Sequence, residues 1–250
     1  MSKTSYSACV LIIGNEILSG RTQDVNLNYI ATRLGARGIP VREARCIPDI
    51  PEVIVSAVNE CRTKYDFVFT TGGIGPTHDD ITAECVAKAF EVPLERHPEA
   101  MRLLEEHYKN YPGGVNESRA RMANVPKGGE LLRNPVSKAP GFRIGNVHVM
   151  AGVPSIMQAM FDTLLPTLPE GDPVVMKSVS CRLREGDIAV ALEAIQNRYP
   201  DLDIGSYPAL HEGQPQVTLV AKGQDADAVG AAAQEIADMV RGFGEEPQLS

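Results

Sequence analysis

The sequence predicts an α/β protein with a doubly wound, mostly parallel sheet, followed by a small C-terminal α+β domain. Apolar runs at residues 9–13 and 67–69 are typical of strands that are buried on both faces of a parallel sheet. A segment with helical spacing follows each run, and glycine-containing turns lie between them. In such folds ligands bind at the carboxyl ends of the strands, so we expect the functional residues there.

The first domain is predicted to cover residues 1–170 and to alternate strands with helices. The expected strands lie at residues 9–13, 41–47, 67–70, 129–133, 142–144 and 147–150. The expected helices lie at residues 26–35, 52–64, 81–90, 98–109, 118–123 and 154–165. Gly145 and Asn146 are typical of the tight turn of a hairpin between the last two strands.

A second, accessory domain is predicted for residues 171–250, because prolines and glycines between residues 166 and 173 indicate a linker. Its pattern is β-α-β-β-α. The expected segments lie at residues 174–183, 187–198, 203–207, 216–221 and 226–241.

Composition excludes several classes of protein. A net charge of -8, without a cluster of lysine and arginine, argues against nucleic acid as a partner. The cysteines are scattered and show no zinc spacing, which argues against a structural metal. The apolar run at residues 8–13 is too short for a signal-peptide core or a membrane span. We therefore expect a cytoplasmic protein without a membrane partner.

The turn after the strand at 67–70 is the most informative segment. Glycines let its backbone approach a ligand closely, and the start of the next helix presents unpaired N–H groups, which suits a phosphate. Asp79 and Asp80, together with Glu16, are predicted to hold a divalent cation beside that phosphate. Alternatively, Asp80 could be only a helix N-cap and the glycines only a tight turn.

Several ordered motifs carry a resemblance to a known family. They are residues 13–20, Asp24 with Asn26, residues 71–80 with Thr82 and Glu84, and residues 134–135, 139–142 and 151–154. Over about residues 9–168 they resemble the competence/damage-inducible protein A (CinA) family. That family shares its molybdopterin-binding fold with the MoaB/Mog group of cofactor-biosynthesis proteins and with the amino-terminal domain of FAD synthase. The chain resembles the short form of the family, which lacks a deamidase domain.

The resemblance implies a choice of activities. We expect a metal-dependent nucleotide pyrophosphatase that cleaves a dinucleotide-like diphosphate such as ADP-ribose or FAD. The alternative is a molybdopterin-binding or adenylyl-transferring protein of molybdenum cofactor biosynthesis, and a third hypothesis is a non-catalytic module that binds a nucleotide or a pterin. The implied metal is Mg²⁺, Mn²⁺ or Co²⁺, with K⁺ as a further candidate. Relatives assemble as dimers or trimers, which implies a homo-oligomer.

The same resemblance, with the turn, selects the site residues. Asp49 and Asp80 fall at the positions of an acidic pair in the Mog group, and with Asp79 they are the predicted catalytic residues. Asp49 is expected to orient or deprotonate the attacking water. The predicted ligand-binding residues are Gly14, Asn15, Glu16, Gly20, Asp24, Asn26, Thr71, Gly72, Gly73, Gly75, Pro76, Thr77, Asn134, Pro140, Gly141, Gly152 and Pro154.

Some assignments stay open at this point. Many relatives have an aspartate in place of Asn15, so this chain lacks one possible metal ligand. Lys138 could contact a phosphate or be a solvated loop lysine, and His78 could be a general base or an exposed loop residue. Asp24 and Asn26 could close the site or simply cap the first helix.

Overall fold

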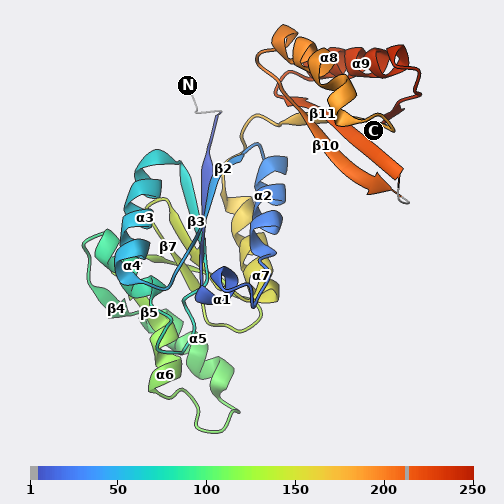
Figure 1. The fold of residues 1–250 in the computed structure, drawn as a ribbon. Helices are drawn as coiled ribbons and strands as arrows, with labels where there is room; N and C mark the ends of the chain where they lie inside the picture. The colour runs from blue at the N-terminus through green and yellow to red at the C-terminus, as the bar shows by residue number, and fades with distance from the viewer. Residues whose placement is uncertain (1–4, 212–213) are drawn as a thin grey trace. The chain divides into compact units, whose positions relative to one another are not determined.

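The computed structural model describes residues 5–211 and 214–250, and the chain divides into two compact units, Met1–Gly171 and Asp172–Ser250 (Figure 1). The N-terminal unit is built on a sheet with the strand order β2-β1-β3-β8-β7-β6. Its strands are β1 (Ala8–Ile13), β2 (Val41–Ile47), β3 (Phe67–Thr71), β6 (Glu130–Leu132), β7 (Gly141–Ile144) and β8 (Val147–Met150).

The direction of the strands confirms the predicted fold class. The four neighbours β2, β1, β3 and β8 are parallel, whereas β7 runs antiparallel to both β8 and β6. Strand β1 lies inside the sheet and every residue in it is buried, as its continuous apolar sequence predicts.

Helices cover both faces of this sheet (Figure 1). Helices α2 (Asn26–Ala36) and α7 (Pro154–Leu164) pack on one face, where Ile30 and Phe161 belong to the same buried cluster. Helices α3 (Pro51–Lys64) and α4 (Thr82–Ala89) pack on the other face through residues such as Val58 and Val86. The sheet is therefore sandwiched between two apolar layers, which holds its carboxyl edge in a defined position.

A segment between β3 and β6 differs from the prediction. Two short strands, β4 (Leu94–Arg96) and β5 (Asn124–Pro126), pair antiparallel and enclose α5 (Pro98–Tyr108), α6 (Glu117–Ala120) and a 3-10 turn, η1 (Arg121–Ala123). The expected helix at 118–123 is thus a short helix followed by a 3-10 turn. We call the segment from β4 to β5 the excursion; Ala100, Leu104 and Ala123 form its small core.

Smaller differences occur at element ends. The helix expected at 81–90 begins at Thr82, and a one-turn helix, α1 (Asn15–Leu18), follows β1 where no helix was predicted. A 3-10 turn, η2 (Leu165–Thr167), follows α7. One-turn helical elements such as α1 and η2 carry too little periodicity for prediction.

The C-terminal unit has the predicted β-α-β-β-α order with one additional short strand. Its elements are β9 (Val175–Cys181), α8 (Glu185–Arg198), β10 (Asp203–His211), β11 (Gln214–Gly223), α9 (Ala226–Gly242) and β12 (Gln248–Leu249). The sheet order is β10-β11-β9-β12, and all three pairings are antiparallel. Both helices contribute to one core, where Ile188 and Ile236 pack with Leu219.

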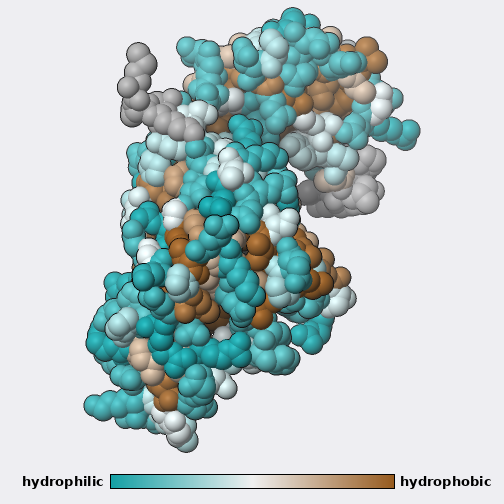
Figure 2. Space-filling view, turned by 90° about the vertical axis from the view of Figure 1, so that its left-hand side faces the viewer, coloured by the Kyte–Doolittle hydropathy of each residue, from teal (hydrophilic) through white to brown (hydrophobic). Residues whose placement is uncertain are grey.

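Hydrophilic residues cover most of the surface shown in Figure 2, with hydrophobic residues exposed across the middle of the N-terminal unit. Among the helices within residues 5–211 and 214–250, none is long and apolar enough to cross a bilayer.

Candidate functional site

The carboxyl edge of the N-terminal sheet brings together most of the predicted site residues. Because β1, β2, β3 and β8 are parallel, the residues that follow them lie at one edge. Direct contacts link these ends: Gly14 N donates to Ile47 O at 3.1 Å, and Gly72 N donates to Met150 O at 3.1 Å. Strand β6 ends and β7 begins at the same edge, since β7 runs antiparallel to both of its neighbours.

The glycines at positions 72 and 73 are required by close backbone approach. Gly72 has a φ of +102°, and a Cβ there would lie 2.2 Å from the carbonyl oxygen of Ile13. Gly73 has a φ of +69°, and its Cβ would lie 2.1 Å from Oγ1 of Thr82. Thr82 closes the turn, because its Oγ1 donates to Gly72 O at 3.0 Å and its N–H donates to Gly73 O at 3.0 Å. Other side chains would disrupt this turn.

The turn leaves a row of backbone donors without partners. Within the described part of the chain, the N–H groups of Gly73, Ile74 and Gly75 make no hydrogen bond. The N–H groups of Ala83 and Glu84, in the first turn of α4, are also unpaired within that part. Successive free N–H groups beside a helix start form a concave positive site for an anion.

Asp79 and Asp80 follow this turn and are both contacted by Thr77. Thr77 N donates to Oδ2 of Asp80 at 2.8 Å, and Thr77 Oγ1 lies 2.6 Å from a carboxylate oxygen of each aspartate. The hydrogen bond from Thr77 holds the pKa of Asp79 below its usual value. Asp80 is not the N-cap of α4: Ile81 occupies that position, and no side chain caps the helix.

Asp49 and Glu16 lie around the end of β1. Oδ2 of Asp49 accepts a hydrogen bond of 2.8 Å from Asn15 N, so this carboxylate ties the ends of β1 and β2 together. A Cβ on Gly14 would meet the Glu16 carboxylate at 2.5 Å, so the glycine leaves room for that side chain to fold back.

The predicted metal ligands do not converge. Among residues 5–211 and 214–250, no three histidine, cysteine, aspartate or glutamate side chains are grouped so that they could hold a metal ion. The expected set of Glu16, Asp79 and Asp80 therefore stays a prediction: the Glu16 side chain folds over Gly14, whereas Thr77 hydrogen-bonds to the two aspartates at the other turn. The residues present do not fit a metal ion held by the protein alone.

Asp24 and Asn26 organise the start of α2. Val25 occupies the N-cap position of α2, but Oδ2 of the preceding Asp24 accepts from Leu27 N at 3.0 Å and so satisfies an N–H group in the first turn. Nδ2 of Asn26 donates to Gly152 O at 2.8 Å and ties α2 to the end of β8. Oδ1 of Asn26 and Oγ1 of Thr71 are buried and have no partner among the described residues.

Other predicted site residues shape the surrounding loops. The side-chain amide of Asn134 forms hydrogen bonds within its own loop. Its Nδ2 donates to Ser137 Oγ and Ala139 O, and its Oδ1 accepts from the N–H groups of Val136 and Ser137. A Cβ on Gly141 would lie 2.1 Å from Val149 O, so this glycine lets β7 approach β8. Pro154 begins α7, Gly20 has a φ of +72°, and Pro76, His78 and Lys138 are exposed.

A cavity of about 80 Å³ lies beside the glycine turn. The turn and α4 line it with Gly73, Ile74, Gly75, Asp80, Ala83 and Glu84. Phe142 of β7 and Pro140, which precedes that strand, also line it. The excursion contributes Leu94, Arg121, Met122 and Asn124, none of which the sequence analysis selected. No local pattern marks these residues, because the short pairing of β4 with β5 brings them to the site.

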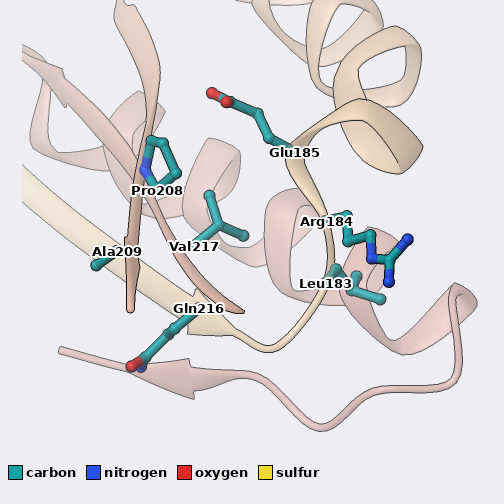
Figure 3. A pocket seen from close by; sticks show the side chains of 7 residues that line it. All are labelled: Leu183, Arg184, Glu185, Pro208, Ala209, Gln216 and Val217. Atoms are coloured by element: carbon teal, nitrogen blue, oxygen red, sulfur yellow. The ribbon is translucent and has the colours of Figure 1, made fainter. Parts of the chain in front are cut away.

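The C-terminal unit has a larger hollow of about 400 Å³ (Figure 3). In this view the Glu185 side chain extends toward the strand that carries Pro208, whereas the Arg184 side chain points away from that strand. Glu185 is hydrogen-bonded to Ser206 Oγ. No residue predicted for the site lies in this hollow, so the glycine turn of the N-terminal unit remains the candidate site.

Comparison with known proteins places this geometry in a family. A family profile described as "Probable molybdopterin binding domain" matches residues 9–170, which is more than half of the chain. The chain belongs to this molybdopterin-binding family. A second profile, "FAD synthase, middle domain", matches residues 173–244, which lie in the C-terminal unit.

Individual relatives agree with this assignment and with the predicted CinA resemblance. A protein of Archaeoglobus fulgidus is 34% identical over 92% of this chain and 96% of its own length. A CinA-like protein of Geobacter sp. is 35% identical over 91% of this chain, which spans 56% of that relative. The crystal structure of CinA from Thermoplasma acidophilum, described as having unknown function, has a TM-score of 0.61 and 31% identity over 66% of this chain and 99% of its own.

Proposed function

We propose that this protein binds a phosphorylated small molecule of the pterin or nucleotide type at the carboxyl edge of its N-terminal sheet. The observation that carries this proposal is the row of N–H groups at Gly73, Ile74 and Gly75, beside the start of α4, which have no partner among the described residues. In the adjoining small cavity, Leu94 and Phe142 offer apolar surface against which part of a heterocycle can pack, beside polar residues such as Asn124.

The family assignment supports the alternative expected from the sequence, a protein that binds molybdopterin. The matching profile is named for molybdopterin binding and covers every residue predicted for the site. A pterin that carries a phosphate matches both features of the site. Its phosphate can accept hydrogen bonds from the free amides, and its ring can pack against the apolar side chains. Molybdopterin binding is therefore our leading proposal.

Cleavage of a nucleotide diphosphate and transfer of an adenylyl group are finer hypotheses for the same site. Support comes from Asp80, which lines the cavity and whose Oδ1 has no partner among the described residues. Among residues 5–211 and 214–250 no three carboxylate, histidine or cysteine side chains are grouped so that they could hold a metal ion, so we propose binding before hydrolysis.

The decisive experiment incubates the purified protein with molybdopterin, with molybdopterin plus ATP, and with ADP-ribose, FAD or NAD. Each mixture contains Mg²⁺, Mn²⁺ or Co²⁺ together with K⁺, and both retained ligand and products are identified. Retention of molybdopterin without turnover is the expected result. Release of AMP from a dinucleotide would favour the pyrophosphatase, and adenylylated molybdopterin would favour the transferase. Neither retention nor turnover of any compound would contradict the proposal.

A further inference from the structure

Arg121 lies on the excursion, far in sequence from the glycine turn, yet it lines the same cavity. It is the cationic residue in a lining that otherwise consists of apolar residues, Asn124 and two carboxylates. Within the described part of the chain, its guanidinium makes no hydrogen bond and no ion pair. The neighbouring arginines are tied down: Arg119 donates to Gly114 O and lies over the Tyr108 ring, and Arg96 pairs with Glu117 at 2.9 Å.

The two carboxylates in the lining already have partners. Thr77 donates to Oδ2 of Asp80 at 2.8 Å, and Lys88 pairs with Glu84 at 2.8 Å. Neither carboxylate lies within 4.0 Å of Arg121, so the charge of the guanidinium is left without an internal counterion among the described residues. Half-buried arginines normally pair with an anion, because the planar fork suits carboxylates and phosphates.

The excursion presents Arg121 on a supported segment. Oδ1 of Asn116 accepts from Arg119 N at 2.9 Å and caps α6, and Asn124 N donates to Arg121 O to close the 3-10 turn. Ala123 is fully buried in the small core of the excursion. These contacts fix the backbone on both sides of Arg121 and leave its side chain available.

We propose that Arg121 is a specificity-determining residue that binds the terminal phosphate of the ligand, together with the free N–H groups of Gly73, Ile74 and Gly75. This inference rests on the proposed function and deepens it. The amides supply directed donors, and the guanidinium supplies the net positive charge that an acidic chain otherwise lacks at this place. The site would therefore select ligands that end in a phosphate over the same ligands without it.

The test measures binding of inorganic pyrophosphate by calorimetry, at several salt concentrations, to the full chain and to Arg121→Gln, Arg121→Lys and Arg42→Gln. Arg42 is exposed on β2 and does not line the cavity, so its replacement removes the same charge elsewhere. We expect Arg121→Gln to weaken binding by about tenfold or more and to flatten its salt dependence. We expect Arg121→Lys to recover part of the affinity and Arg42→Gln to bind normally.

The outcomes separate this inference from the proposed function. Normal binding and an unchanged salt slope in Arg121→Gln would overturn the role of Arg121 and leave the amide site intact. Equal losses in Arg121→Gln and Arg42→Gln would also overturn it, since the effect would then belong to net charge alone. Absence of binding by the unaltered protein would overturn both. Thermal melting of each variant confirms that a loss of binding is measured on folded protein.

Discussion

At Gly72, one substitution can test whether the turn depends on close backbone contact. Gly72→Ala forces a Cβ into the carbonyl oxygen of Ile13 at a φ of +102°, so we expect a loss of roughly 3 kcal/mol or more in unfolding free energy. Urea denaturation measures the loss. Gly35→Ala is the matched control: it lies in α2 with open space around it and should be neutral or slightly stabilising. Equal stability of the two variants would contradict our account of the turn.

His148 is a second residue whose role the structure makes testable. Its ring is buried on β8, stacks on Phe69 at 5.0 Å between ring centres, and neither nitrogen has a partner in the described part of the chain. Burial, with a smaller contribution from Arg143, lowers the pKa of His148 to about 4. The folded state therefore keeps this histidine neutral in a pH range where the unfolded chain protonates it.

We predict that His148 makes stability depend on pH. In the unfolded chain His148 is protonated below a pKa of about 6.5, whereas in the folded protein it is protonated only below about 4. Protons therefore bind more readily to the unfolded chain, and stability falls as the pH drops from 6.5 to 4. Over this whole pH range, His148 lowers the free energy of unfolding by about 3 kcal/mol. His148→Leu removes the titrating group without breaking a hydrogen bond and should flatten this part of the profile. Exposed His78→Leu is the control and should retain the slope.

The junction between the turn and α4 is the element on which the site depends. Thr82 is fully buried and donates its hydroxyl to Gly72 O, so Thr82→Val keeps the shape but leaves that carbonyl without this donor. We expect a loss of about 1–2 kcal/mol in unfolding free energy, together with weaker pyrophosphate binding. Thr63→Val removes an exposed hydroxyl bond on α3 and should change stability by less than about 0.5 kcal/mol. Similar losses in both variants would argue against a special role for Thr82.

At the level of the complete chain, the two units have separate hydrophobic cores. We predict that a chain ending at Gly171 folds and binds pyrophosphate with unchanged affinity, because every residue assigned to the site precedes that position. A chain that ends at Gly171 keeps the hydrogen bond from the Arg37 guanidinium to Leu168 O and the one from Gly171 N to Arg37 O. Circular dichroism and calorimetry measure folding and binding. A folded fragment that does not bind would mean that the second unit contributes to the site.

Most of the regular structure could be predicted because burial leaves a repeating record in the sequence. A continuous apolar run such as β1 is required when both faces of a strand are covered, and the spacing of Ile30 and Leu34 marks the inner face of α2. The glycines at 72 and 73 were also recognisable, since only glycine tolerates their backbone geometry. The short elements α1, β4, β5 and β12 were not predicted. The equally short strands β7 and β8 were predicted, because Gly145 and Asn146 mark the hairpin turn between them.

The partners of the site residues could not be read in the same way. The charges of Asp79, Asp80 and Glu16 predict a metal site, and that stays a prediction; where the Glu16 carboxylate lies relative to the two aspartates depends on how the turns after β1 and β3 are placed. Arg121 carried no local signal, and only the pairing of β4 with β5 brings the excursion to the glycine turn. Local sequence shows the backbone conformation that neighbours along the chain favour, and its apolar period shows which face of an element is buried. Which charged groups meet depends on contacts between distant segments, and the tertiary structure alone decides those contacts.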